Sequence, residues 1–179
     1  MKKSMRTSIR DKRKNLPVKW ILANSKKVTK KLLPRCKKFK NIMVYASFDG
    51  EVDTHVLINE LLKQKKNVIL PKIRDRLLMP IKISGFEDLL PGRYGILEPQ
   101  QNTTFPIKKI DLIILPGVCF DKNCHRIGFG EGYYDKFLPK LNCPIIALAF
   151  DFQIVEKIQN DPHDVPVDLI ITEKRIIKR

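Results

Sequence analysis

Short runs of consecutive apolar residues alternate along the chain with segments of helical spacing. Such runs are typical of strands that are buried on both faces of a sheet, and their length distinguishes them from helices. The predicted strands cover residues 41–46, 67–70, 77–83, 111–115, 144–150 and 167–171. Pro80 lies inside the third run, which places that strand at a sheet edge or at a break.

Apolar positions three or four residues apart predict helices between these strands and at the start of the chain. The expected helices have their apolar sides within residues 5–16, 18–32, 56–62 and 131–138, and a short helix is expected near 153–158. Ser4 and Thr54 are candidate caps, Pro17 suits a first turn, and Pro34 is a stop signal. Residues 84–110 are rich in glycine and proline and are expected to form loops.

Strands that alternate with helices predict a three-layer α/β/α protein with a mostly parallel, Rossmann-like central sheet. The 179 residues suffice for one well-buried domain. We expect a single domain over 1–179, composed of a basic helical segment (1–40) and an α/β core (41–179). Ligands of such sheets bind at the carboxyl ends of the strands. Polar and glycine-rich segments follow the predicted strands at 47–53, 71–72, 116–132 and 150–153.

The composition is that of a globular protein, with 43% hydrophobic and 30% charged residues. No apolar run approaches the roughly 20 residues that a membrane span needs. The first residues also lack the apolar segment of a secretory signal. We therefore expect a cytoplasmic monomer with no membrane partner. The four cysteines show no Cys-x-x-Cys spacing, which argues against a structural zinc, and a disulfide framework is not expected in an intracellular chain of this size.

The net charge of +16 is concentrated at the N-terminus. Residues 1–40 hold 16 of the 35 Lys and Arg and one acid, Asp11, whereas residues 41–179 hold 19 basic and 18 acidic residues. The first segment (+15) therefore predicts an anionic partner: nucleic acid, a nucleotide or another polyanion. Trp20 and Phe39 are its only aromatics, and Trp20 reads as packing. Without a recognisable binding motif, a nucleic-acid-binding module is the weaker alternative.

The segment 116–138 combines glycines, cations and aromatic residues directly after a predicted buried strand. Gly128, Gly130 and Gly132 occupy alternate positions between Arg126 and a predicted helix start. Glycines let backbone N–H groups approach an anion, and a helix N-terminus adds positive potential. The spacing matches neither a Walker A loop nor a Rossmann fingerprint, so the glycines alone indicate phosphate only weakly. Their cationic and aromatic neighbours strengthen that interpretation.

Residues 126–135, Arg-Ile-Gly-Phe-Gly-Glu-Gly-Tyr-Tyr-Asp, follow Phe120-Asp121 and closely resemble the signature of 5-formyltetrahydrofolate cyclo-ligases, also called methenyltetrahydrofolate synthetases. The resemblance covers nearly the whole chain. It includes the Lys/Arg-rich opening helix and, in order, segments at 51–54, 70–71, 95–99, 149–153, 163–168 and 172–173. Each piece is common, but the ordered set is highly specific.

The resemblance implies a reaction of folate and ATP. The γ-phosphoryl group of ATP would pass to the formyl oxygen of 5-formyltetrahydrofolate, with or without a polyglutamate tail. N10 of the folate would then attack the activated carbon and close the ring. The products would be 5,10-methenyltetrahydrofolate, ADP and phosphate. Mg²⁺ would neutralise charge on the phosphates, and phosphoryl transfer of this kind depends on positioning and electrostatics.

The resemblance also implies the residues that bind ATP and act in catalysis. The implied ATP contacts are Lys2, Arg6, Arg126, Gly128, Gly130, Glu131, Gly132, Tyr133 and Tyr134. Arg126, Tyr133 and Tyr134 would be catalytic. Lys2 and Arg6 are four residues apart and share one helix face, although Lys3 or Arg10 is an alternative to either.

The implied folate contacts are Glu51, Tyr94, Phe129 and Tyr133, with the Glu51 carboxylate accepting from adjacent pterin N–H groups. Core filling is an alternative role for Tyr94. The implied metal ligands are Asp135 and Asp168. Helix stabilisation is the alternative for Asp135, and a strand-edge turn is the alternative for Asp168. We expect His163 to order its loop.

Glu131 departs from the family, which generally has a small or basic residue at this position. A carboxylate beside bound phosphates repels them unless it points away or pairs with Lys122 or Arg126. This departure motivates a third hypothesis, a nucleotide-binding relative that kept the fold and changed its reaction.

Overall fold

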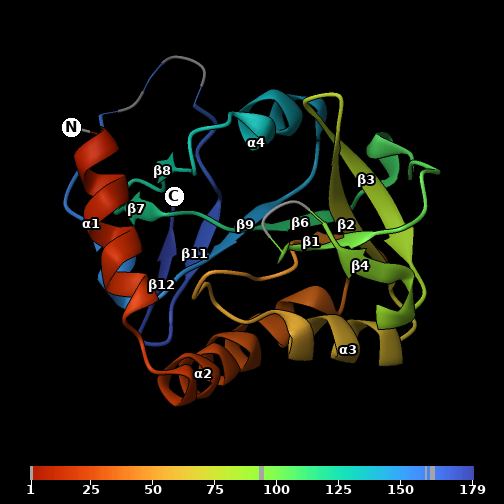
Figure 1. The fold of residues 1–179 in the computed structure, drawn as a ribbon, viewed down its shortest axis with the longest axis horizontal. Coiled ribbons are helices and arrows are strands. Elements are labelled where there is room, and N and C mark those ends of the chain that lie inside the picture. Colours follow the sequence, from red (N-terminus) through yellow and green to blue (C-terminus); the bar gives the residue numbers. More distant parts are fainter. Residues whose placement is uncertain (1, 93–94, 160, 162–163) are drawn as a thin grey trace.

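A seven-stranded sheet runs through the middle of the protein (Figure 1). The computed structural model describes residues 2–92, 95–159, 161 and 164–179. The strand order is β12-β11-β9-β6-β1-β2-β3, in which β11, β9, β6, β1 and β2 are parallel and the edge strands β3 and β12 are antiparallel. The strands are β1 (Asn41–Val44), β2 (Asn67–Arg74), β3 (Leu77–Ile83), β6 (Leu112–Leu115), β9 (Ile145–Leu148), β11 (Leu169–Ile171) and β12 (Ile176–Lys178). The predicted fold class, a mostly parallel sheet in an α/β protein, is confirmed.

The central strands read as continuous apolar runs because both faces of the sheet are buried. Ile42 and Val44 of β1 belong to one hydrophobic core, and Met43 between them belongs to the other. Helices α2 (Val18–Cys36) and α3 (His55–Lys63) cover the first face (Figure 1). The opposite face is covered by α4 (Tyr133–Phe137) and the adjoining 3₁₀ turn.

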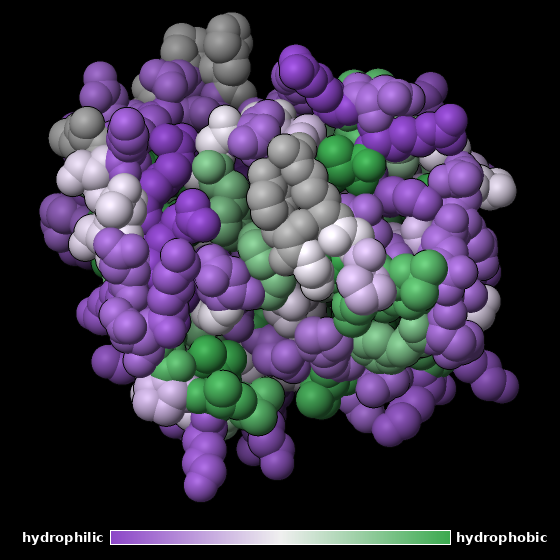
Figure 2. All heavy atoms as spheres, viewed as in Figure 1, coloured by the Kyte–Doolittle hydropathy of each residue, from purple (hydrophilic) through white to green (hydrophobic). Residues whose placement is uncertain are grey.

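Helix α1 (Lys2–Lys14) packs beside a small sheet whose strands lie in the order β10-β7-β8. These strands are β7 (Cys119–Asp121), β8 (Arg126–Ile127) and β10 (Ile154–Val155). Met5 and Ile9 of the helix pack against Cys119, Ile127 and Ile158. The outer surface on the α1 side is almost entirely hydrophilic (Figure 2). The few apolar residues of α1 therefore hold this basic helix against the core.

Two prolines mark places where the observed elements differ from the predicted ones. Pro34 lies inside α2, which continues to Cys36 because Leu32 and Cys36 are buried in the core and hold the last turn. Pro71 does not end β2, which continues to Arg74 in an antiparallel ladder with β3. Pro80 lies in β3 at the sheet edge, as predicted, where a residue without a backbone N–H is tolerated.

The predicted helix near 153–158 is wrong. A 3₁₀ turn at Asp151–Gln153 leads directly into β10, whose pairing with β7 replaces local helical hydrogen bonds. The helix predicted at 131–138 is limited to α4, followed by a 3₁₀ turn at Leu138–Lys140 that contains Pro139. Ser4 lies within α1 rather than at its start. The expected loop region contains a two-stranded sheet of β4 (Leu89–Pro91) and β5 (Leu97–Pro99).

No helix in the described part of the chain is both long enough and apolar enough to cross a bilayer.

Candidate active site

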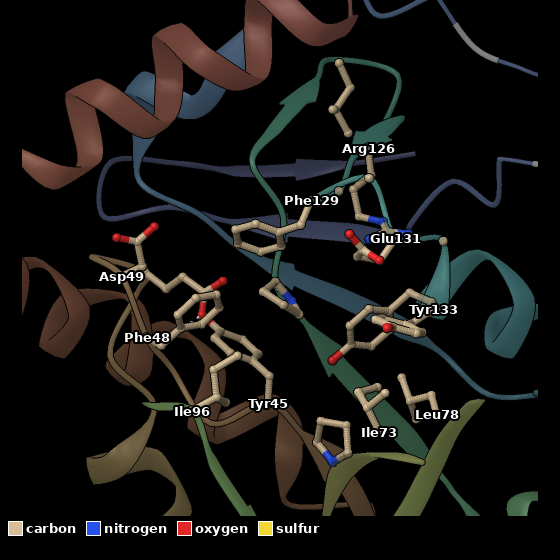
Figure 3. A pocket seen from close by; sticks show the side chains of 18 of the residues that line it. Tyr45, Phe48, Asp49, Ile73, Leu78, Ile96, Arg126, Phe129, Glu131 and Tyr133 are labelled. Carbon is tan, nitrogen blue, oxygen red and sulfur yellow. Dashed lines mark hydrogen bonds between the residues drawn. The ribbon is translucent and has the colours of Figure 1, made fainter. Parts of the chain in front are cut away.

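A cavity of about 660 Å³ opens where the direction of strand addition reverses. The chain places β2 on one side of β1 and β6 on the other, so the carboxyl ends of β1 and β6 form a topological switch point. Tyr45 and Ala46 follow β1, Pro116 follows β6, and all three line the cavity. Ligands of open α/β sheets bind at this point. Figure 3 shows side chains from several elements converging on it.

The predicted glycine loop forms one wall of the cavity, which residues 128–135 line without interruption. Gly130 has φ +109° and Gly132 has φ +70°, conformations that side-chain-bearing residues rarely adopt. Gly132 immediately precedes α4. Because α4 has only five residues, its summed dipole is small, and the loop N–H groups are the better candidates for contacting an anion.

The buried Arg126 and the partly exposed Asp135 form an ion pair at this loop. Arg126 Nη2 donates to Asp135 Oδ1 at 2.5 Å, and the guanidinium carbon lies 5.6 Å from the centre of the Tyr134 ring. The Arg126 side chain is 4% exposed, and burial lowers its pKa, opposed mainly by the charge of Asp135. Burial also raises the pKa of Tyr134. The structure therefore brings together a cation, a carboxylate and a neutral phenol.

Helix α1 adds cations to the same cavity. Lys2, Arg6, Arg10 and Lys14 line it, whereas Lys3 lies on another face with Ser4 and Thr7. Arg6 Nε donates to the carbonyl oxygen of Gly128 at 2.8 Å. Lys2 Nζ contacts Asp161 and Asp164 at 2.6 and 2.7 Å. Of the alternatives at the helix start, Lys2 rather than Lys3 reaches the cavity, and Arg10 lines it as well.

A buried carboxylate lies where the loop after β1 meets the cavity. Glu51 is 5% exposed, and its Oε2 accepts from the backbone N–H of Phe48 at 3.1 Å. Burial raises the pKa of its carboxyl to about 7, opposed by the guanidinium of Arg13. Asp49, in the same loop, also raises this pKa. Glu51 is therefore a buried acceptor that titrates near neutral pH.

Aromatic and aliphatic side chains form the remaining walls. Phe48 and Phe129 have ring centres 5.4 Å apart, and Tyr133 lies across the cavity from them (Figure 3). Ile73 and Ile96 are also part of the lining. Flat apolar walls with few polar groups suit a planar heterocycle. Tyr94 and His163 lie outside the described residues.

The structure does not bring Asp168 together with Asp135. Asp168 precedes β11, at the amino end of the parallel strands, and it is not among the residues that line the cavity. Its Oδ2 accepts from the backbone N–H of Ile145 at 2.8 Å. This contact is the strand-edge role considered above. Asp164, by contrast, does line the cavity.

Glu131 lines the cavity and is exposed. The partners proposed for it are engaged elsewhere: Lys122 pairs with Glu156, and Arg126 pairs with Asp135. Among the described residues, no ion pair compensates the Glu131 carboxylate.

The sequence reading missed Arg13 and Asp49. Lys2, Arg6, Arg10 and Arg13 are spaced by four, four and three residues, so one side of a helix carries all of them. That spacing was a usable signal for a cationic face. Asp49 has φ +48°, which the sequence does not reveal.

Comparison with known proteins decides the family. The model of the 5-formyltetrahydrofolate cyclo-ligase family matches residues 1–173. The chain belongs to this family. A 5-formyltetrahydrofolate cyclo-ligase of Haemophilus influenzae is 33% identical over 182 residues, which cover 95% of this chain and 97% of the relative. A mouse cyclo-ligase is 28% identical over 193 residues, which cover 96% and 93%.

Solved structures of cyclo-ligases share the fold over almost the whole chain. The 5,10-methenyltetrahydrofolate synthetase of Aquifex aeolicus, solved by NMR, has a TM-score of 0.89 at 35% identity, covering 99% of this chain and 92% of that one. The synthetase of Mycoplasma pneumoniae has a TM-score of 0.80 at 27% identity, covering 96% and 98%. The resemblance drawn from the signature is thus confirmed at the level of family and fold.

Proposed function

We propose that this enzyme converts 5-formyltetrahydrofolate to 5,10-methenyltetrahydrofolate and consumes ATP, which becomes ADP and phosphate. The observation that carries the proposal is a single cavity that combines two kinds of polar group. Lys2 and Arg6 of α1 line it together with the glycine loop, and so does the buried Glu51. Polyphosphate suits the cations and the loop N–H groups, and the N–H donors of a pterin suit the carboxylate.

The reaction that we propose has two covalent steps. The formyl oxygen attacks the γ-phosphorus, the bond to the β-phosphate oxygen breaks, and ADP leaves. N10 then attacks the formyl carbon, the C–O bond breaks with loss of phosphate, and N10 loses its proton. The formyl oxygen therefore ends in the released phosphate. Neither step requires a protein nucleophile, so the residues act by position and charge.

The side chains have distinct tasks in this scheme. Arg126, fixed by Asp135, offers a cation that does not have to reorganise during the transfer. Arg6 and Lys2 would contact the phosphates from α1, with the Lys2 ammonium leaving Asp161 and Asp164 to do so. Tyr133, Tyr134 and Phe129 would enclose the formyl group and keep water from its activated carbon.

Asp135 fits a Mg²⁺ ion that arrives with ATP. Mg²⁺ is commonly held by one or two carboxylates together with water and substrate phosphates. One oxygen of Asp135 accepts from Arg126, and the other has no protein hydrogen-bond partner among the described residues. The bound ion would supply charge neutralisation on the phosphates. Asp168 is not proposed as its second ligand, because its carboxylate bonds at the amino end of the strands.

The decisive experiment follows formation of the methenyl chromophore from 5-formyltetrahydrofolate with and without Mg-ATP, beside the Haemophilus influenzae relative as a positive control. We expect product only with ATP, together with one ADP per turnover. Folded protein that forms no product while the control is active would refute the proposal. Tight ATP binding without folate turnover would favour the relative with an altered reaction, which the uncompensated Glu131 supports.

A further inference from the structure

Four buried polar atoms that have no hydrogen-bond partner in the described part of the chain meet around Glu51. They are Nη1 and Nη2 of Arg13, Oδ2 of Asp49 and Oε1 of Glu51. Nη1 of Arg13 lies 3.9 Å from Glu51 Oε1, and Nη2 lies 3.6 Å from Asp49 Oδ2. Both separations are too long for direct hydrogen bonds. Buried polar atoms are usually paired, so a cluster of unpaired ones calls for an explanation.

The guanidinium of Arg13 is held firmly in this place. Its side chain has no exposed surface, Nε donates to the carbonyl oxygen of Asp49 at 2.8 Å, and the group lies 5.4 Å from the centre of the Phe129 ring. A Cβ added at Gly50 would lie 2.9 Å from the carbonyl oxygen of Arg13, so this glycine allows the loop to approach α1 closely. Packing alone does not require a charge here, and an apolar side chain avoids the desolvation cost.

We propose that Arg13 is a positioning residue that keeps the Glu51 carboxylate ionised and aimed at the N–H groups of a heterocyclic ligand. The inference rests on the proposed function, in which that heterocycle is the pterin of 5-formyltetrahydrofolate. Oε2 of Glu51 accepts from the backbone N–H of Phe48, whereas Oε1 is buried beside Arg13 without a hydrogen-bond partner among the described residues, and Glu51 lines the cavity. Arg13 is not itself among the residues that line the cavity, so it acts through Glu51.

The charges that act on Glu51 come from several elements. Arg13 on α1 lowers its pKa, and Asp49 in its own loop raises it. Tyr45 at the end of β1 and Tyr134 on α4 also face it, but burial raises the pKa of both phenols, so they remain neutral near pH 7. A carboxylate is ionised above its pKa. Folate affinity should therefore rise with pH through about 7, the value to which burial raises the Glu51 pKa, and then level off.

The test is calorimetric titration of 5-formyltetrahydrofolate into the full-length protein from pH 5.5 to 9. Arg13→Gln removes the cation, so the rise in affinity moves to higher pH, and affinity at pH 7 falls about fivefold for the first unit of that move and about tenfold for each further unit. Lys12→Gln is the matched control, because Lys12 is the exposed neighbour on α1 and does not line the cavity. We expect the wild-type profile for this variant. An unchanged profile in Arg13→Gln would overturn the inference.

Two further variants separate positioning from stability. In a Glu51→Gln background the folate affinity no longer depends on pH, and adding Arg13→Gln should then change this affinity little. If Arg13→Gln lowers the affinity as much in this background as in the wild type, Arg13 does not act through Glu51. Arg13→Lys keeps the charge but lacks the fork, so its midpoint stays while its plateau affinity falls several-fold. If Arg13→Lys has the plateau affinity of the wild type, the positioning role is overturned, and this holds even if Arg13→Gln does not fold.

Failure of the proposed function is a distinguishable result. Wild-type protein that binds no 5-formyltetrahydrofolate at any pH overturns both proposals. Wild-type protein that binds with a pH-dependent affinity, beside an Arg13→Gln variant with the same profile, overturns only the role of Arg13.

Discussion

Replacing Asp135 by alanine removes the carboxylate that compensates the buried Arg126. Nη2 of Arg126 is 2.5 Å from Asp135 Oδ1, and the Arg126 side chain is 4% exposed. Its Nε already has no hydrogen-bond partner among the described residues. After the substitution the guanidinium keeps its charge, since arginine does not lose its proton in a protein. The variant therefore holds a buried, poorly compensated cation.

The expected loss of stability lies between two limits. Breaking a fully buried pair by removing one partner costs about 3–5 kcal/mol. The Asp135 side chain is 39% exposed, however, so water can reach the site and the lower range of about 1.5–3 kcal/mol for a hydrogen bond to a charged group applies. Asp164 also acts on the charge of Arg126. We expect a loss of about 2 kcal/mol in the free energy of unfolding.

Urea denaturation measures this loss, and the methenyl chromophore measures turnover. Asp135→Ala should abolish turnover while the protein remains folded without denaturant. Asp135→Asn is the matched control, because its amide oxygen still accepts from Arg126. It should recover about half of the lost stability and none of the turnover, since the negative charge is absent. A wild-type urea midpoint in Asp135→Ala, or wild-type turnover in either variant, would refute the reasoning.

Three further substitutions test the rest of the glycine-loop wall. Arg126→Ala should abolish turnover with the fold retained, as judged by circular dichroism; unchanged activity would contradict its catalytic role. Glu131→Gln should lower the KM for ATP about fivefold, because a repulsion of about 1 kcal/mol is removed, and the difference should shrink in high salt; an equal or higher KM would mean that this carboxylate does not repel ATP. Gly132→Ala should lower the free energy of unfolding, measured by urea denaturation, by about 1 kcal/mol, because an alanine at φ +70° is strained; the space around the added Cβ is open, so no clash adds to this cost. A wild-type urea midpoint would show that the loop relaxes.

The central sheet could be predicted because its signal is local. β6 and β9 are apolar throughout and β1 is apolar after Asn41, and burial on both faces produces such runs whichever strands are their neighbours. The small sheet β10-β7-β8 was not predictable in this way. Its strands have two or three residues each, and β10 exists because it pairs with β7, more than thirty positions earlier in the chain. The conformation of this segment is therefore set by a strand that is distant in the sequence, although the segment's own apolar spacing favours a helix.

The candidate site divides along the same line. The loop at 126–135 could be located from sequence because its residues are contiguous and follow a buried strand, and the cavity does include them. Asp168 was assigned to the metal from the resemblance alone, although it stands at the start of the predicted strand 167–171, and the start of a parallel strand lies at the sheet edge opposite the ligand. In the structure it precedes β11 and bonds to Ile145. Arg13 was overlooked because a basic helix offers many cations, and which of them is buried depends on how α1 packs.

The packing of α1 also explains how so basic a segment lies against the core. Its apolar contacts are Met5 and Ile9, and three of its cations are met by acids of other segments. The pairs are Lys2 with Asp161 and Asp164, Arg10 with Asp49, and Arg13 with Asp49 and Glu51. An entering polyphosphate therefore competes with these carboxylates for the cations of α1. Nucleotide affinity then depends on the acids as much as on the bases, and changing an acid partner such as Asp161 should alter it as directly as changing Lys2.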